Sequence, residues 1–338
     1  MIRHLMLTLL LAALCCAPAH AAVTFDWATV GNPGNADDIH GAGYGGVDGI
    51  YRISKTEVTN AQYTEFLNAV AATDSFGGSD PTLYNTSMGS STWGGILRSG
   101  SAGSYTYSVK PAAVGAGPGG ADGDDYTYAN KPVVYVSFFD AMRFTNWLHN
   151  GQGSGGTETG VYNISDGLSE VRAADAKYWI PSEDEWYKAA YYDPNAGGGS
   201  GAYYCYPTST NGVPNNNLPS ADTGNSANFF DSGYTTGDSS YPMTDVGAYA
   251  LSESPYGTFD QGGNVWEWNE TVISPSFRGL RGGSWSTDDF DLRAAFRNSF
   301  SPTSESGNIG FRVATVPEPS TVLMGALAAV GLLLRRSV

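Results

Sequence analysis

The chain has 338 residues, and 41% of them are hydrophobic, enough to bury the core of one large domain or of two ordinary ones. Its 44 glycines and 17 prolines follow no fixed period, which excludes collagen and argues against a helical bundle. The formal net charge of −16 argues against a nucleic-acid partner, because an acidic surface repels backbone phosphates.

Residues 1–21 have the features of a signal peptide. Arg3 precedes an apolar run at 5–16, and a small-x-small cleavage sequence ends at Ala21. The apolar run is too short to span a bilayer. We therefore expect export, cleavage by a signal peptidase, and a mature chain that starts at residue 22.

Three helix starts are predicted from capping boxes, in which a Ser or Thr is followed three residues later by a side chain that bonds back to it. The pairs are Thr59 with Gln62, Ser137 with Asp140, and Ser182 with Glu185. Apolar residues recur at helical spacing after each start. Short strands are expected at 51–53, 104–109, 132–137 and 178–180. Residues 197–314 should be nearly free of helix, so we expect one α+β domain over 22–315 with little regular secondary structure and many Gly-rich loops.

The C-terminus carries a second processing pattern at 316–338. A Pro-Glu-Pro segment begins at Pro317, an apolar stretch covers 321–334, and two arginines follow. Fourteen residues make a helix of about 21 Å, shorter than the ~30 Å hydrocarbon core. This order resembles the PEP-CTERM sorting signal, which implies a Gram-negative bacterium, transient membrane anchoring by a short hydrophobic helix, and release by an exosortase to the cell surface or medium. An ordinary C-terminal membrane anchor is the alternative.

Cysteine and histidine are scarce. Cys15 and Cys16 lie in the predicted signal peptide, so the mature chain keeps only Cys205 and can form no intrachain disulfide. The mature histidines are His40 and His149, far apart in sequence. A zinc cluster or a Cys–His catalytic pair is therefore not expected.

Six segments, in this order, resemble the formylglycine-generating enzyme (sulfatase-modifying factor) family. They are Glu-Val-Thr-Asn-Ala-Gln-Tyr at 57–63, the stretch 132–147, Ile-Pro-Ser-Glu-Asp-Glu-Trp at 180–186, Gly-Asn-Val-Trp-Glu-Trp at 263–268, Arg-Gly-Gly-Ser-Trp at 281–285 and Gly-Phe-Arg at 310–312. The resemblance covers about 51–314. It implies a C-type-lectin-like α+β fold with much irregular backbone.

Catalytic members of that family use two active-site cysteines, shortly after the Gly-Gly-Ser segment, to bind copper and oxidise a substrate cysteine. The same stretch here, 285–293, contains no cysteine. Ser286, Thr287 and Asp289 offer hard oxygens, which do not replace the soft thiolates that Cu(I) prefers. Copper is therefore not expected. Relatives that use non-haem iron depend on His ligands, and two scattered histidines fit that chemistry poorly.

The resemblance also implies calcium. Its first site carries over to Asp260, Gly263, Val265 and Glu267, where two carboxylates and two backbone carbonyls supply hard oxygens. The alternative is that Asp260 and Glu267 cap turns or pair with a buried arginine.

A second calcium site carries over, less securely, to Asn228 (side chain), Phe229 (carbonyl), Asp238 (side chain) and Ser240 (carbonyl). The positions of Asp238 and Ser240 depend on an alignment across a variable loop.

Other charged residues invite a catalytic or binding interpretation. Glu183 and Glu185 could be taken for an acid–base pair, but on a helix they point in different directions, and Glu185 fits a capping role. Arg281, Arg297 and Arg312 either form an anion pocket or anchor loops, and the second is favoured.

The region 285–297 is the expected presented surface, and its polar and aromatic residues form a candidate ligand cleft: Trp285, Ser286, Thr287, Asp289 and Arg297. We expect an exported, catalytically silent, calcium-stabilised module that binds a peptide, protein or glycan at the cell surface. The alternatives are a formylglycine-generating or related metal-dependent oxidase acting on a protein cysteine, and a structural component of a polysaccharide matrix.

Overall fold

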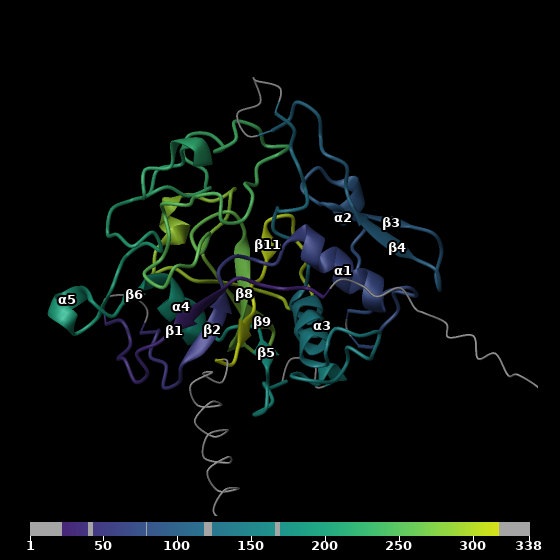
Figure 1. Ribbon diagram of the computed structural model, residues 1–338, viewed down its shortest axis with the longest axis horizontal. Helices are drawn as coiled ribbons and strands as arrows, with labels where there is room; N and C mark the ends of the chain where they lie inside the picture. The colour runs from purple at the N-terminus through teal and green to yellow at the C-terminus, as the bar shows by residue number, and fades with distance from the viewer. Residues whose placement is uncertain (1–21, 40–42, 79, 118–123, 166–169, 318–338) are drawn as a thin grey trace, which may run out of the picture.

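A computed structural model describes residues 22–39, 43–78, 80–117, 124–165 and 170–317 (Figure 1). The predicted signal peptide at 1–21 and the hydrophobic tail helix at 321–334 lie outside the described residues. Within those ranges, no helix is both long enough and apolar enough to cross a membrane.

The three predicted capping boxes are confirmed. They open α1 (Asn60–Val70), α3 (Phe138–His149) and α4 (Glu183–Tyr191), and in each the N-cap side chain accepts from the third backbone N–H while the third side chain bonds back. Other helical segments that lie within the described residues are short: α2 (Ser87–Ser90), α5 (Ala196–Gly199), η2 (Pro219–Ala221) and η3 (Asp289–Leu292).

One antiparallel sheet has the strand order β1-β2-β12-β5. It consists of β1 (Trp27–Val30), β2 (Tyr51–Ser54), β5 (Tyr178–Trp179) and β12 (Ala314–Thr315). The last strand in the sequence is thus central, with β2 on one side and β5 on the other. This arrangement ties the end of the family-like region to its beginning.

The second sheet has the order β10-β9-β8-β11 and is centred on a long hairpin. It consists of β8 (Trp266–Ser274), β9 (Phe277–Arg281), β10 (Asn298–Phe300) and β11 (Ile309–Gly310), and only β11 is parallel to its neighbour. Two further hairpins pair β3 (Ile96–Ser99) with β4 (Thr106–Val109) and β6 (Tyr192–Asp193) with β7 (Ala202–Tyr203).

One strand prediction is wrong. Residues 132–137 form no regular strand; only an isolated bridge joins Pro132 to Thr59. The backbone of this segment bonds to two different partners: Val133 N–H donates to the Val58 carbonyl, and Tyr135 N–H donates to the Ser306 carbonyl. Tyr135 also has a left-handed φ of 60°, which interrupts the alternation that the sequence suggested.

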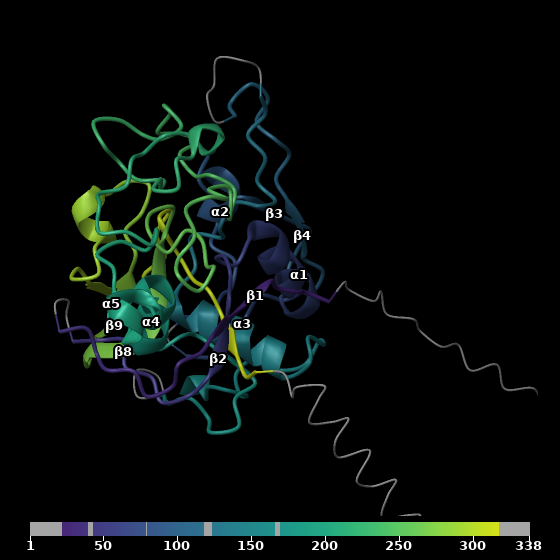
Figure 2. The same ribbon diagram turned by 60° about the vertical axis from the view of Figure 1, so that its left-hand side comes forward.

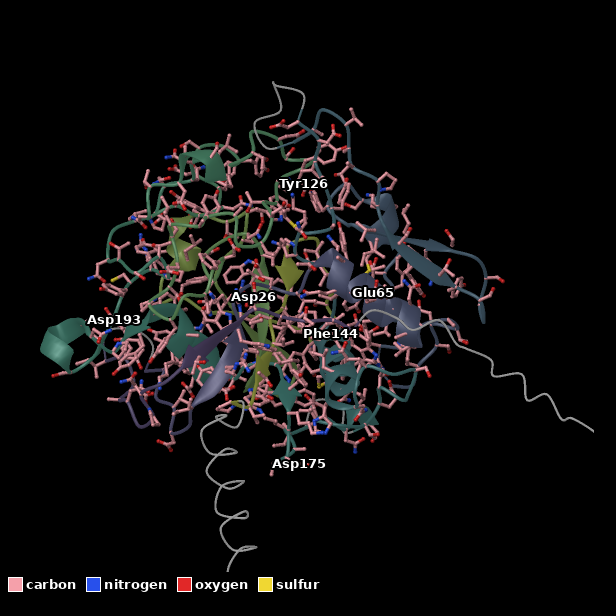
Figure 3. All side chains as sticks on the ribbon, viewed as in Figure 1. Asp26, Glu65, Tyr126, Phe144, Asp175 and Asp193 are labelled. Atoms are coloured by element: carbon pink, nitrogen blue, oxygen red, sulfur yellow. The ribbon has the colours of Figure 1, made fainter. Side chains whose placement is uncertain are left out.

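The core lies where α1 and α3 pack on the sheets. Phe144 is its centre: its ring lies 5.3 Å from Phe66, 5.7 Å from Trp147 and 5.4 Å from Phe311, measured between centroids. Figure 3 shows Phe144 among the side chains that fill the middle of the molecule, with Asp175 and Asp193 toward its periphery. In both ribbon views α4 and α5 lie on the opposite side from α1 and the β3–β4 hairpin (Figure 2).

Candidate functional site

Glu267, predicted as a calcium ligand, lies inside a buried ion pair. Its carboxylate accepts from Arg312 Nε at 2.6 Å and Nη2 at 2.7 Å, and from Trp186 Nε1 at 2.8 Å. Both partners of the pair are fully buried. These contacts match the alternative of pairing with a buried arginine, and a calcium role for Glu267 stays a prediction.

Asp260 lies at the turn before β8, with a left-handed φ of 59°. Its Oδ2 accepts from Gly247 N–H at 2.5 Å. Burial raises the pKa of Asp260 to about 6, against the lowering effect of the Gly247 N–H and of Arg312. Burial disfavours the charged form of Asp260, and a bound cation would stabilise that form. The calcium role of Asp260 stays a prediction.

The other two residues of this loop contribute backbone. Gly263 has φ 88° and forms a bridge with Asn228, where an added Cβ would lie 2.2 Å from the Asn228 carbonyl oxygen. Val265 is buried in a small apolar cluster with Trp285. The fold therefore places the loop of the first predicted calcium site directly against Asn228, which belongs to the second predicted calcium site.

Three buried oxygens near this contact have no hydrogen-bond partner among the residues that the structure describes: Glu57 Oε2, Asn228 Oδ1 and Thr244 Oγ1. Asn264 joins their residues. Its Oδ1 accepts from Asn228 Nδ2 at 3.1 Å and from Thr244 N–H at 3.3 Å, and its Nδ2 donates to Glu57 Oε1 at 3.2 Å. Unpaired buried acceptors are costly unless a proton, water or cation satisfies them.

All three atoms are hard oxygens, the type of donor that calcium prefers. Burial, then the charges of Asp260 and Glu267, raise the pKa of Glu57, with Arg312 opposing. Among the described residues no group of three or more His, Cys, Asp or Glu side chains is arranged to hold a metal, so a cation here would depend on amide, hydroxyl and carbonyl oxygens as well. Sequence reasoning missed Glu57 and Thr244. Glu57 opens one of the family-like segments, which was the available signal.

The second predicted calcium site is spread over a buried and an exposed part. Asn228 and Phe229 are buried, and the Phe229 carbonyl accepts from Thr235 Oγ1 at 3.3 Å. Asp238 and Ser240 are exposed, and Asp238 Oδ1 accepts from Ser240 N–H at 2.7 Å within a local turn. The site stays a prediction.

Two of the candidate cleft residues line a serine-rich turn beside an indole. Trp285 is 4% exposed and packs against Trp93, with ring centroids 5.0 Å apart. The next residue, Ser286, is exposed, and its hydroxyl lies 3.1 Å from Ser284 Oγ. Thr287 Oγ1 accepts from Ser284 N–H at 3.0 Å, so Thr287 stabilises the same turn.

The remaining cleft residues have other partners. Asp289 accepts from Tyr206 Oη at 3.0 Å and from Arg293 Nη2 at 2.7 Å. Arg297 donates to Glu183 at 2.5 Å, and its guanidinium lies 4.9 Å from the Tyr44 ring. The structure thus brings Trp285, Ser286 and Thr287 together, while Asp289 and Arg297 each belong to a separate contact.

Glu183 and Glu185 of α4 are held by ion pairs and by a helix cap. Glu183 pairs with Arg281 and Arg297, and Arg281 also donates to the carbonyls of Ala294 and Phe296. Glu185 closes its capping box and bonds Arg172 and Trp179 Nε1. The sequence interpretation of caps and loop anchors is confirmed for these groups.

The donor set beside the Gly-Gly-Ser turn does not fit copper. Residues 285–297 contain no thiol. Cys205 is distant in sequence but close in space, because its carbonyl accepts from Ala294 N–H at 2.9 Å. One exposed thiol does not supply the pair of thiolates that a Cu(I) site of the family's kind requires.

The capped helices, the two small sheets and the long loops define an α+β domain of the formylglycine-generating-enzyme type. The chain belongs to the family described as sulfatase-modifying factor enzyme 1-like domain, which matches residues 47–316. A PEP-CTERM protein-sorting motif matches residues 315–337; such a signal directs export to the cell envelope or surface of Gram-negative bacteria and implies recognition by an exosortase.

Named relatives differ in activity. The formylglycine-generating enzyme of Streptomyces coelicolor is 26% identical over 294 residues, covering 78% of this chain and 77% of that protein. The hercynine oxygenase of Mycolicibacterium smegmatis is 28% identical and covers 50% of this chain, and the chain spans 34% of that relative's length. The inactive Cα-formylglycine-generating enzyme 2 of Mus musculus is 32% identical and covers 40% of this chain and 42% of that protein.

Solved structures show the same fold. CarF covers 88% of this chain and all of its own, with TM-score 0.51 and 18% identity. Variable protein 1 of Treponema denticola covers 88% of this chain and 98% of its own, with TM-score 0.52 and 18% identity. At this identity the likeness establishes architecture alone.

Proposed function

We propose that the protein is an exported, catalytically silent member of its family, stabilised by calcium, that binds a ligand at the cell surface. The observation that carries the proposal is the missing thiolate pair: the turn after Gly283 presents Ser284, Ser286 and Thr287, bonded to one another. Named relatives include inactive proteins as well as enzymes, so family membership is compatible with loss of activity.

The calcium part of the proposal is supported by the unpaired oxygens of Glu57, Asn228 and Thr244. Arg312 is the cation that opposes the negative charges of Glu57, Asp260 and Glu267, and a bound calcium ion would add positive charge beside the same three carboxylates. Binding to the folded state alone would stabilise it by about 2.7 kcal/mol at a concentration one hundred times Kd.

Elemental analysis of the purified protein tests the cation directly. We expect bound calcium and neither copper nor iron. Thermal unfolding with calcium and with a chelator then separates two roles for Glu57. If Glu57 binds the cation, Glu57→Gln lowers the calcium-dependent gain in Tm; if it does not, removing one of three crowded carboxylates raises Tm in both buffers. Glu253→Gln, at an exposed position, is the control.

The second candidate function is oxidation of a protein cysteine, supported by the match to the Streptomyces coelicolor enzyme over most of both chains. Incubation with a cysteine-bearing sulfatase peptide and copper, followed by mass spectrometry, distinguishes the two. We expect the peptide mass to stay unchanged. Conversion of the cysteine to an aldehyde would overturn the proposed silence.

Export and release complete the proposal. We expect signal peptidase to remove residues 1–21 and exosortase to remove the tail after transient membrane anchoring. Mass spectrometry of the protein recovered from the producing cells and their medium would show both ends. An intact tail on protein in the medium would contradict release by cleavage.

A further inference from the structure

Four aromatic rings lie in a row near the Gly-Gly-Ser turn, and we call them the aromatic strip: Trp93, Trp285, Tyr234 and Phe230. Successive ring centroids are 5.0 Å, 5.9 Å and 5.1 Å apart. The rings come from three segments far apart in the sequence, which the fold brings together. Trp285 is 4% exposed, Trp93 and Tyr234 on either side of it are half-buried, and Phe230 is 37% exposed.

The two indoles are held rigidly. Trp93 Nε1 donates to the Ser239 carbonyl at 2.9 Å, and Trp285 Nε1 donates to the Gly307 carbonyl at 3.4 Å. Gly307 lies against Trp93 so closely that a Cβ there would be 2.4 Å from the ring. Because both N–H groups are already used, what the strip offers a ligand is ring surface, presented at little cost in side-chain entropy.

Neutral hydroxyl and amide groups lie beside Trp285, and the exposed charged residues next to the strip in sequence, Asp231 and Asp238, are acidic. Ser286 is exposed, and its hydroxyl accepts from Asn308 Nδ2 at 3.1 Å. The side-chain hydrogen-bond partners of the four rings, among the described residues, are backbone carbonyls of Ser239 and Gly307. The strip therefore offers apolar ring faces beside hydroxyl and amide groups, and the nearby carboxylates disfavour an anionic ligand.

These features define the chemistry of the ligand. A pyranose ring has an apolar C–H face and a rim of hydroxyls, which together match ring surface flanked by neutral hydrogen-bonding groups. The chain's net charge of −16 repels polyanions. We propose that the aromatic strip binds a neutral polysaccharide, with sugar rings stacked on Trp93 and Tyr234 and sugar hydroxyls bonded at Ser286 and Asn308. This inference rests on the proposed binding function and assigns its ligand class.

The test is titration of the purified protein with neutral oligosaccharides, cellohexaose, laminarihexaose and mannohexaose, followed by tryptophan fluorescence and calorimetry. We expect saturable binding that is insensitive to salt, and no binding of an alginate oligomer of equal length. Trp93→Ala and Tyr234→Ala should each weaken binding roughly tenfold, the loss of one stacked ring. Phe277→Ala and Phe300→Ala, at exposed positions on β9 and β10, should bind as the parent does.

Ser286→Ala separates a loss of binding from a loss of folding. It removes an exposed hydroxyl, so it should weaken binding several-fold while the Tm stays unchanged. Absence of binding by every neutral oligosaccharide up to 10 mM, or equal binding by the strip variants and the parent, overturns the inference. Binding of a peptide at the strip would also overturn the polysaccharide inference, but it would agree with the proposed function as a binding module. Oxidation of the cysteine peptide would instead remove the proposed function itself.

Discussion

The Glu267 carboxylate and the Arg312 guanidinium form a fully buried bidentate pair, with Nε and Nη2 at 2.6 Å and 2.7 Å from the two oxygens. Arg312 also donates to the carbonyls of Ser54, Lys55 and Phe259. One side chain near the end of the domain therefore joins β8 to the segment after β2. Its charge is compensated inside the protein, so removal of either partner leaves the other buried without its hydrogen-bonded counter-charge.

Glu267→Gln should lower the free energy of unfolding by roughly 3–5 kcal/mol, because buried Arg312 would lose its bidentate hydrogen-bonded counter-charge. Urea unfolding in the presence of a chelator measures this effect apart from any bound cation. Asp289→Asn, in the partly exposed pair with Arg293, should cost about 0–1 kcal/mol. Equal costs for the two variants would contradict the burial of the Glu267–Arg312 pair.

Ser182→Ala should destabilise α4 by about 1 kcal/mol, because its hydroxyl accepts from Glu185 N–H at 3.1 Å and closes the capping box. Ser200→Ala is the matched control, since Ser200 is exposed at the end of α5. Chemical unfolding of both variants is the measurement. A Ser182→Ala protein as stable as the parent would mean that the cap contributes nothing.

Glu305 makes stability depend on pH. Burial, with the nearby Asp80 and Asp74, raises its pKa to about 7, while Asn85 opposes the shift. The unfolded carboxyl ionises near 4.5, so the folded state binds more protons between those values, and this contribution to stability is lost as pH rises from about 4.5 to 7.

Glu305→Gln should therefore stabilise the protein at pH 8 by about 1 kcal/mol, a value reduced for solvent screening, and have little effect at pH 4.5. Denaturation at the two pH values checks it. Burial raises the pKa of Asp140 as well, and Asp80 and Glu305 add to the shift, so a residual pH dependence of the same sign should remain in the variant. The reverse order, with the variant less stable at pH 8, would contradict the assignment.

Gly263→Ala should be strongly destabilising, by more than about 3 kcal/mol, because the new Cβ would meet the Asn228 carbonyl oxygen at 2.2 Å in a left-handed conformation. Gly257→Ala is the control: its φ is also positive, at 76°, but its nearest neighbour would lie at 3.6 Å. The control should lose only about 1–2 kcal/mol of backbone strain. Thermal unfolding compares them, and similar losses would remove the steric argument.

Local chemistry explains which elements could be predicted. Each capping box is complete within four residues, so Thr59, Ser137 and Ser182 marked the helix starts from the sequence alone. The hairpin of β8 and β9 was not predicted. Its strands alternate poorly because Glu267 and Arg281, both charged, are buried in it.

The candidate site shows the same limit. A carried-over motif indicated Asp260 and Glu267 as ligands, but it contains no information on Arg312, which lies 45 residues away and occupies the Glu267 carboxylate. Glu57 and Asn264 are hydrogen-bonded across 207 residues, and no spacing rule connects them. Cys205 beside Ala294 is a further contact that only the folded chain reveals.

The position of β12 places the end of the family domain inside a sheet, directly next to the sorting motif. Ala314 and Thr315 lie between β2 and β5. This sheet can therefore form completely only when nearly the last residues of the family domain are free to fold. The sorting motif begins at residue 315, within that strand. A cut that removed Ala314 and Thr315 would take β12 out of the sheet, leaving the β1–β2 pair and β5 without a partner strand in this sheet.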